Sequence, residues 1–176
     1  MSKDNMIKPI LVLTLICLIV AGVLSITNSF TAPVIAEGAA QRESDVRKAV
    51  LPDADGFEAV DIAGLPPSVT EVYKATNGVG YVFSLSVNGY GGNIIILCAI
   101  GEDGKIVHNS VTEQSETQGL GSRVAGAPFQ DQFIGKDAGS LSSIDTISGA
   151  TISSKAYLRA ISDAFTAFDT IAGTGK

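Results

Sequence analysis

The sequence contains no tryptophan, one histidine and only two cysteines in 176 residues. Cys17 lies inside an apolar segment, so a disulfide between it and Cys98 in a folded domain is geometrically unfavourable. Neither cysteine belongs to a CxxC motif or to a cluster with histidine, and the sequence therefore supports no zinc or iron–sulfur site within this chain. We expect both cysteines to act as small packing residues.

Basic residues are also scarce. The chain has 12 Lys and Arg against 18 Asp and Glu, a formal net charge of −6, and a sequence pI of about 4.6. The basic residues form no dense run and such a surface repels a phosphate backbone, so nucleic-acid binding is disfavoured. The single histidine, His108, is expected to be a half-exposed strand residue and not a proton carrier.

Charge is absent from one long segment near the N-terminus. Residues 10–26 read ILVLTLICLIVAGVLSI, and continuation through residue 30 supplies the roughly 20 residues that a membrane-spanning helix needs. Pro9 suits the first turn of such a helix. Lys3 and Lys8 precede the segment, whereas the next basic residue is Arg42. This asymmetry predicts a single-pass transmembrane helix over residues 10–30, with residues 1–9 in the cytoplasm and the rest outside.

Two other roles for this segment are weaker. A cleaved signal peptide has a shorter apolar core of about 7–15 residues, and the small-residue site at residues 34–36 is distant. A lipoprotein would use Cys17, but the bulky Ile16 precedes it where such a site needs a small residue. An uncleaved anchor is therefore the preferred interpretation.

The rest of the sequence predicts a stalk, a small domain and a tail. Residues 31–66 are expected to be a helical stalk, whose helix runs from residue 31 to about residue 51. Residues 67–171 hold runs of strand-forming residues at 69–75, 81–87, 93–100 and 105–111, joined by Asn-Gly, glycine-rich and Asp-Gly turn signals. They indicate a small antiparallel meander whose third strand is buried on both faces. Residues 172–176 are expected to be a frayed tail.

The domain ends in a predicted amphipathic helix from about residue 153 to residue 168. Its apolar stripe, at three- and four-residue spacing, is assigned to core packing and consists of Tyr157, Ile161, Ala164, Phe165 and Phe168. Ser153 or Ser154 is a plausible cap. The predicted fold class is therefore α+β, with one N-terminal transmembrane helix followed by a small antiparallel-sheet domain flanked by helices.

Two segments carry candidate chemistry. Residues 145–154 read DTISGATISS and bring small and hydroxylated residues to the start of the last helix, where free N–H groups and the helix dipole favour a phosphate. Residues 115–123 read SETQGLGSR, and their glycines allow the backbone to approach a flat ligand closely. The second segment is not GxGxxG, because Val124 occupies the last glycine position. Composition alone favours an ordinary capped helix start for the first segment.

Taken together, these segments resemble a known family. The features that carry the resemblance are the anchor, the Gly89–Gly92 turn, the Glu-Thr-x-Gly-Leu-Gly loop and the Asp-x-x-Ser-Gly-Ala-Thr motif. They are similar to those of the FMN-binding G subunit of Rnf-type ion-translocating oxidoreductase (ferredoxin:NAD+ oxidoreductase) complexes, which is related to the C subunit of Na+-translocating NADH:quinone reductase. One departure is Gln118, where the family frequently has proline, and it makes the loop less rigid.

The resemblance implies a covalently bound cofactor. A flavin transferase would join the phosphate of FMN to the hydroxyl of Thr151 as a phosphoester. The other FMN-binding residues that it implies are Glu116, Thr117, Gly119, Leu120, Ser148, Gly149 and Ala150. Tyr90 could also stack on a flavin, but packing of its ring on hairpin neighbours is favoured.

The resemblance also implies a place in a larger machine. The chain would be an electron-transfer subunit, incomplete as an enzyme alone, of a redox-driven ion pump in the bacterial cell membrane that moves electrons between reduced ferredoxin and NAD+. Its partners would be the other membrane and iron–sulfur subunits of the complex, the flavin transferase and membrane lipid. Three alternatives stay open: a subunit of a Na+-translocating NADH:quinone reductase, a stand-alone extracytoplasmic flavin reductase domain, and a non-redox membrane-anchored binding module.

Overall fold

The computed structural model describes residues 3–61 and 64–174. The chain divides into two compact units, with the division between Ser44 and Asp45. A single helix, α1 (Lys3–Val50), crosses this division, so its residues 45–50 belong to the second unit.

The first unit is the larger part of α1, which includes residues 10–30. Because the helix begins at Lys3, Pro9 lies inside it and not in its first turn, and that expectation was wrong. Within residues 3–61 and 64–174, no helix combines the length and the apolar character that a membrane crossing requires. The predicted transmembrane helix is therefore not confirmed by the structure.

The second unit is built on a five-stranded antiparallel sheet with the strand order β1-β2-β3-β4-β5. The strands are β1 (Phe57–Ala59), β2 (Val69–Ala75), β3 (Gly80–Asn88), β4 (Asn93–Gly101) and β5 (Ile106–Gln114). The four predicted strands are confirmed as a meander of neighbouring hairpins. Strand β1 was not predicted, because it pairs with β2 through only three residues and is too short to show a period of two.

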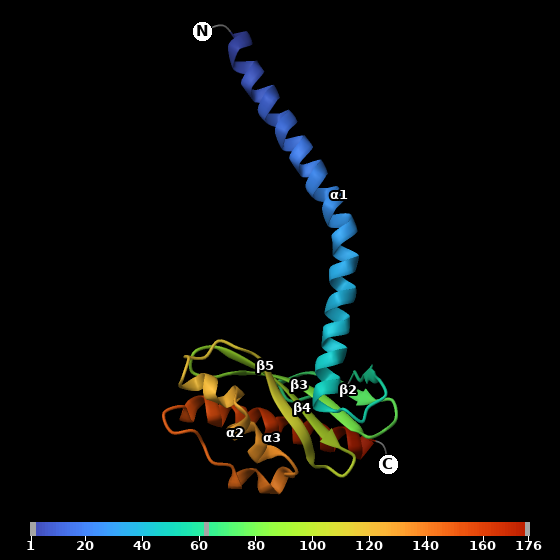
Figure 1. Ribbon diagram of the computed structural model, residues 1–176, viewed down its shortest axis with the longest axis vertical. Coiled ribbons are helices and arrows are strands. Elements are labelled where there is room, and N and C mark those ends of the chain that lie inside the picture. Colours follow the sequence, from blue (N-terminus) through green and yellow to red (C-terminus); the bar gives the residue numbers. More distant parts are fainter. Residues whose placement is uncertain (1–2, 62–63, 175–176) are drawn as a thin grey trace. The chain divides into compact units, whose positions relative to one another are not determined.

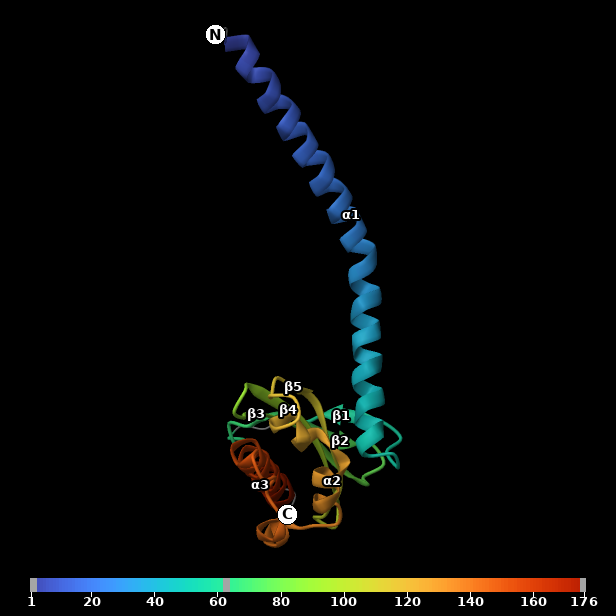
Figure 2. The ribbon, with the colours of Figure 1, turned by 60° about the vertical axis from the view of Figure 1, so that its left-hand side comes forward.

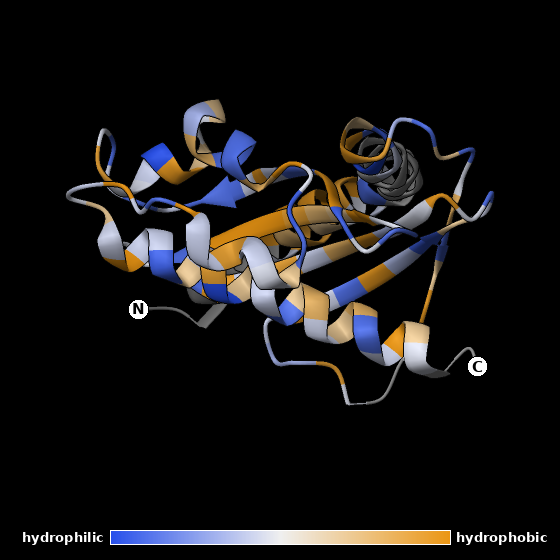
Figure 3. Ribbon diagram, turned by 90° about the horizontal axis from the view of Figure 1, so that it is seen from below, coloured by the Kyte–Doolittle hydropathy of each residue, from blue (hydrophilic) through white to orange (hydrophobic). Residues whose placement is uncertain are grey.

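Both faces of the sheet are covered, which confirms the prediction for the strand over residues 93–100. On one face, Ile94, Ile96, Cys98 and Ile100 of β4 belong to the main core with helix α3 (Thr151–Thr174). On the other face, Leu97 and Ala99 pack with residues 50–54, where α1 ends. Figures 1 and 2 show α3 along one side of the strands, and Figure 3 shows apolar strand positions directly behind it.

Helix α3 differs from the prediction at both ends. It begins at Thr151, so Ser153 and Ser154 lie in its first turn and are not its caps. It continues to Thr174, so residues 172–174 are helical and not a frayed tail, while residues 175–176 lie outside the described residues. The predicted apolar stripe is confirmed, because Tyr157, Ile161, Ala164 and Phe165 are buried and Phe168 packs against them.

Between β5 and α3 the chain folds into short helical turns that were not predicted. They are η1 (Gly121–Ala125), α2 (Ala127–Gln130), η2 (Asp131–Phe133) and η3 (Ala138–Ser143). Phe129 and Phe133 of this segment contact the ring of Tyr157 with centroid separations of 5.3 and 5.2 Å. The segment is thereby held on α3 and leads the chain to residues 145–150, the loop before that helix.

Candidate functional site

Three segments that lie far apart in the sequence meet around one hollow. They are the β3–β4 turn, the loop after β5 and the start of α3. The hollow has a volume of about 420 Å³ and is lined by Tyr90, Glu116, Thr117, Leu120, Gly121, Gly149, Ala150, Thr151, Ile152 and Ser153. We call it the motif hollow, because it contains residues from both segments that the sequence singled out.

A buried carboxylate connects the three segments. The Oε1 atom of Glu116 accepts hydrogen bonds from the backbone N–H groups of Tyr90, at 2.8 Å, and Gly91, at 3.1 Å. Its Oε2 atom accepts a hydrogen bond of 2.9 Å from the hydroxyl of Ser153, which is buried in the first turn of α3. A carboxylate at a helix N-terminus is also favoured by the helix dipole. Glu116 therefore positions the turn, the loop and the helix relative to one another.

Two glycines make room for this carboxylate. A Cβ atom on Gly89 would overlap Oε1 of Glu116, and a Cβ atom on Gly121 would overlap its Oε2. Gly91 is restricted in a different way, since a Cβ there would lie 2.8 Å from the backbone oxygen of Ser115. Gly89, Gly91 and Gly121 are thus explained by the close approach of Glu116 and its loop.

The start of α3 presents a hydroxyl and backbone donors to the hollow. Thr151 is the first residue of the helix and its side chain is exposed. The first N–H groups of a helix have no acceptor within the helix, and this end of the helix dipole attracts an anion. Gly149 has a φ of +83°, a conformation that favours glycine, and it turns the chain into the helix. A hydroxyl and backbone donors suited to an anion therefore lie together.

The loop before α3 is held in place by a second serine. The hydroxyl of Ser154 accepts a hydrogen bond of 3.1 Å from the N–H of Ile147 and donates one of 2.9 Å to the carbonyl of Ala150. Both serines that the sequence suggested as caps therefore serve other contacts. The position of Thr151 is determined by bonds on each side of it.

Most of the predicted cofactor-binding residues come together in the structure. Glu116, Thr117, Leu120, Gly149, Ala150 and Thr151 all line the motif hollow. Ser148 lines a neighbouring hollow of about 400 Å³, together with Arg123 and Asp145. Gly119 lines neither; its φ of +78° shows that it serves the local turn.

The structure adds four lining residues that were not predicted as contacts: Tyr90, Gly121, Ile152 and Ser153. Ile152 is 56 % exposed, and Tyr90 is 75 % exposed. The expectation that Tyr90 packs on its hairpin neighbours was wrong, because the turn directs its ring to the surface beside the hollow. The glycine-rich sequence around Tyr90 could have signalled this outcome, since a tight turn leaves few neighbours for a ring to contact.

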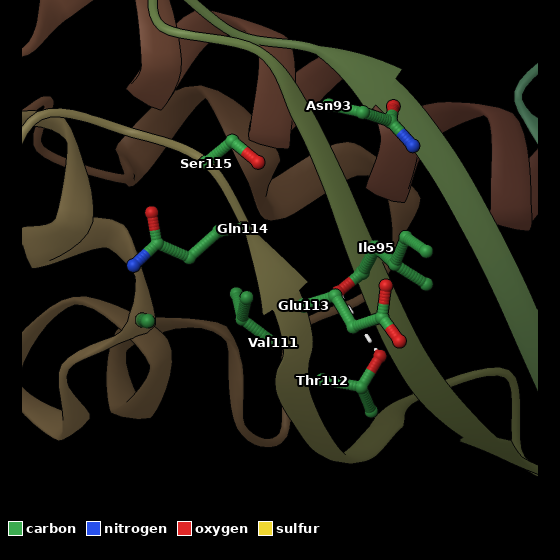
Figure 4. A pocket seen from close by; sticks show the side chains of 8 residues that line it. Asn93, Ile95, Val111, Thr112, Glu113, Gln114 and Ser115 are labelled. Atoms are coloured by element: carbon green, nitrogen blue, oxygen red, sulfur yellow. Dashed lines mark hydrogen bonds between the residues drawn. The ribbon is translucent and has the colours of Figure 1, made fainter.

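A larger hollow lies elsewhere on the sheet. It has a volume of about 600 Å³ and is lined by Asn93, Ile95, Val111, Thr112, Glu113, Gln114, Ser115 and Ala125. Figure 4 shows these side chains beside β4 and β5, with the hydroxyl of Thr112 directed toward the backbone oxygen of Ile95 at 3.4 Å. We call it the strand hollow. Neither of the two predicted segments contributes to it beyond Ser115.

The buried titratable groups near the core are unsuited to proton transfer. Burial raises the pKa of the Cys98 thiol to about 12. Burial, and next the neighbouring Cys98, raise the pKa of the Tyr157 phenol well above its ordinary value. The Tyr157 hydroxyl donates to Oδ1 of Asn109 in the core at 2.5 Å. These groups stay protonated at neutral pH and act as packing and hydrogen-bonding residues.

The motif hollow fits the cofactor that the sequence suggested. Its volume lies within the range of roughly 300–1,000 Å³ that is usual for small-molecule sites. Leu120, Ile152 and Tyr90 supply apolar surface for a flat ring system, and the start of α3 supplies donors for a phosphate. Among residues 3–61 and 64–174, as far as these are described, no group of three or more metal-ligating side chains occurs.

Comparison with known proteins gives consistent matches to two parts of the chain. The family model described as "FMN-binding domain" matches residues 89–166, and the model described as "RnfG N-terminal region" matches residues 1–50. The first match contains the turn, the loop and the motif that form the hollow, and the second coincides with α1.

Curated relatives from bacteria and archaea agree with these matches. The chain is 30 % identical to the G subunit of the proton-translocating ferredoxin:NAD(+) oxidoreductase complex of Clostridium ljungdahlii, over 92 % of this chain and 90 % of the relative. It is 35 % identical to the Na(+)-translocating counterpart of Acetobacterium woodii, over 83 % of each chain. It is 33 % identical to the G subunit of the ion-translocating oxidoreductase complex of Methanosarcina acetivorans, over 93 % of this chain and 94 % of the relative. The chain therefore belongs to the family of G subunits of Rnf-type ion-translocating oxidoreductase complexes, and its second unit contains an FMN-binding domain.

Proposed function

We propose that this chain carries FMN in the motif hollow and transfers electrons within an Rnf-type complex that couples oxidation of ferredoxin by NAD+ to ion translocation. The observation that carries the proposal is the exposed hydroxyl of Thr151 at the first position of α3, beside an apolar hollow. Bound FMN would supply the redox chemistry. The relatives named as complex subunits support the assignment to a multi-subunit assembly.

Different residues of the hollow would contact different parts of FMN. The N-terminal amides of α3 and the hydroxyl of Thr151 hold the phosphate, and Gly149 and Ala150 keep the backbone around it open. Leu120 and Thr117 lie against the ring system. Glu116 acts through its hydrogen bonds to the turn and to Ser153, which keep the hollow in shape. Because the hollow opens to solvent beside exposed residues, a bound ring can exchange electrons with partners.

The attachment at Thr151 is proposed to be covalent, as a phosphoester formed by a flavin transferase. Such a link retains the cofactor outside the cytoplasm, where dissociated flavin is lost. Thr151→Ala removes the hydroxyl, so we expect complete loss of flavin fluorescence from the protein band of a denaturing gel after expression with the transferase. Thr112→Ala, at an exposed threonine of the strand hollow, is the matched control and should keep full fluorescence.

The two variants give opposite outcomes if the assignment is correct. Fluorescent protein in Thr151→Ala would refute attachment at this residue, and loss in both variants would show that the effect is not specific. Absence of fluorescence from the wild type would refute covalent binding altogether.

We also propose that residues 10–30 hold the protein in the cell membrane, with the N-terminus in the cytoplasm and the FMN-binding domain outside. The support is the charge-free run of residues 10–26 and the lysine asymmetry around it. In addition, apolar side chains of this part of α1 are 51–66 % exposed: Val12, Leu13, Leu15, Ile16, Leu18, Ile19, Val20, Val23 and Leu24. Extraction of the full chain from membranes by alkaline carbonate would contradict the proposal.

A further inference from the structure

The backbone of Tyr90 is held by hydrogen bonds, whereas its side chain has no hydrogen-bond or ring partner among the described residues. Its N–H donates to the buried carboxylate of Glu116 at 2.8 Å, and the N–H of Gly89 donates to the carbonyl of Gly92 at 2.8 Å across the turn. The ring is nevertheless 75 % exposed. The turn thus fixes the backbone of Tyr90 and places its side chain at the edge of the motif hollow, which Tyr90 lines.

The rings of the other tyrosines are all in contact with other side chains or buried within the protein. Tyr73 lies under the guanidinium of Arg47, with 3.7 Å from Cζ to the ring centroid, and Tyr81 contacts Phe168 edge to face at 5.8 Å. Tyr157 is fully buried. In the part of the chain that the structure describes, no ring contact, cation contact or side-chain hydrogen bond is found for Tyr90.

The surroundings of Tyr90 are apolar and also exposed. Leu120 is 49 % exposed and Ile152 is 56 % exposed, and both line the same hollow as Tyr90 and Thr151. A single exposed apolar residue needs no explanation, but three around one hollow form a patch that a flat apolar ligand would cover. They come from the three segments that Glu116 holds together, so the patch is built by the same contacts as the hollow.

We propose that Tyr90 is a positioning residue for the flavin, whose ring system lies in contact with the phenol ring. The proposal rests on the proposed function, since it takes FMN in the motif hollow as given. Aromatic rings in contact are stabilised beyond what the burial of their area supplies. The contact would fix the orientation of the flavin ring system. The phosphoester at Thr151 cannot do so, because a link through the phosphate leaves the ring free to rotate.

Fluorescence of the native holoprotein reports this contact directly. A phenol ring in contact with a photoexcited flavin donates an electron to it and takes the electron back without emission of light, so the contact lowers fluorescence with no net reaction. The quantity to measure is the fluorescence of the native protein divided by that of the same sample after unfolding. This ratio is independent of how much flavin the sample carries.

The expected ratio is well below one in the wild type. Tyr90→Leu should raise it at least about twofold because an aliphatic side chain is no electron donor, while Tyr90→Trp should keep it low because indole is one. Tyr73→Leu is the matched control, since Tyr73 packs with Arg47 on the other face of the sheet, and it should leave the ratio unchanged.

Each possible result supports or overturns the role proposed for Tyr90. A wild-type ratio near one, or an unchanged ratio in Tyr90→Leu, overturns the role of Tyr90 while leaving FMN binding intact. If Tyr90→Leu fails to acquire flavin, the fluorescence ratios of the wild type and of Tyr90→Trp serve as the test instead. High ratios in both proteins would then overturn the proposal. Absence of flavin from the unfolded wild type would instead refute the proposed function, so the two failures are distinguishable.

Discussion

The two hollows of the second unit differ in construction more than in size. The strand hollow is the larger, about 600 Å³ against about 420 Å³, yet it is formed along two neighbouring strands, β4 and β5, with Ala125 of η1 beside them. The motif hollow joins three separate segments through the buried carboxylate of Glu116 and has the start of a helix in its wall. Volume is therefore a poor guide to function here. The hollow that we propose as the FMN site is distinguished by the buried polar contacts that hold its loops together.

The largest expected effect comes from filling the space that Glu116 occupies. Gly121→Ala places a methyl group on Oε2 of Glu116, which must move and lose its partners, so we expect a loss of about 2–4 kcal/mol in the free energy of unfolding. Urea denaturation measures it. Gly119→Ala is the matched control, because nothing lies within 4 Å of that Cβ and only the φ of +78° opposes it, at about 1 kcal/mol. Equal losses would show that crowding of the carboxylate is not the cause.

A smaller effect is expected from removing the charge of Glu116. Glu116→Gln keeps the shape but weakens the hydrogen bonds from Tyr90 and Gly91, which a carboxylate strengthens, so stability should fall by about 1.5–2 kcal/mol. Glu113→Gln, at an exposed residue of the strand hollow, should change it by less than about 0.5 kcal/mol. Urea denaturation of both variants gives the comparison. If Glu116→Gln and Glu113→Gln change the stability by similar amounts, the two hollows do not differ in the way we describe.

The smallest effect is expected at the contact between Glu116 and α3. Ser153→Ala removes the buried hydroxyl that donates to Oε2 at 2.9 Å, and we expect a loss of about 1 kcal/mol. Ser115→Ala, at an exposed serine of the strand hollow, is the matched control and should be neutral. Thermal unfolding monitored by circular dichroism measures the difference in stability between the two variants. A neutral Ser153→Ala would leave Glu116 joined only to the turn.

The regular elements were predictable because their signals are local. The strand over residues 69–75 was predicted with the bounds of β2, since strand-forming residues there are followed by an Asn-Gly turn. The burial of both faces of β4 followed from its continuous apolar run. By contrast, β1 has only three residues, and the helical turns between β5 and α3 are stabilised by contacts with α3 that no local pattern contains.

The candidate site was predictable only in part, for the same reason. Most of the residues proposed from the motif and the loop line one hollow, as expected for segments that share a ligand. Ser153 and Ser154 looked like caps because serine is common there, yet their hydroxyls bond Glu116 and the loop before the helix. The exposure of Tyr90 was missed because packing of a ring depends on neighbours that the turn places out of reach.

The sequence by itself determined the meander, the amphipathic last helix and the membership of Thr151 in a recognisable motif, because each depends on residues close together in the chain. Only the tertiary structure decided that Glu116 is the contact that builds the hollow. Its partners lie 26 and 37 residues away in the sequence, at Tyr90 and Ser153. A hydrogen bond between such distant residues exists only after the sheet and the helix have packed. The glycines beside it are needed only because that packing brings the carboxylate close to them.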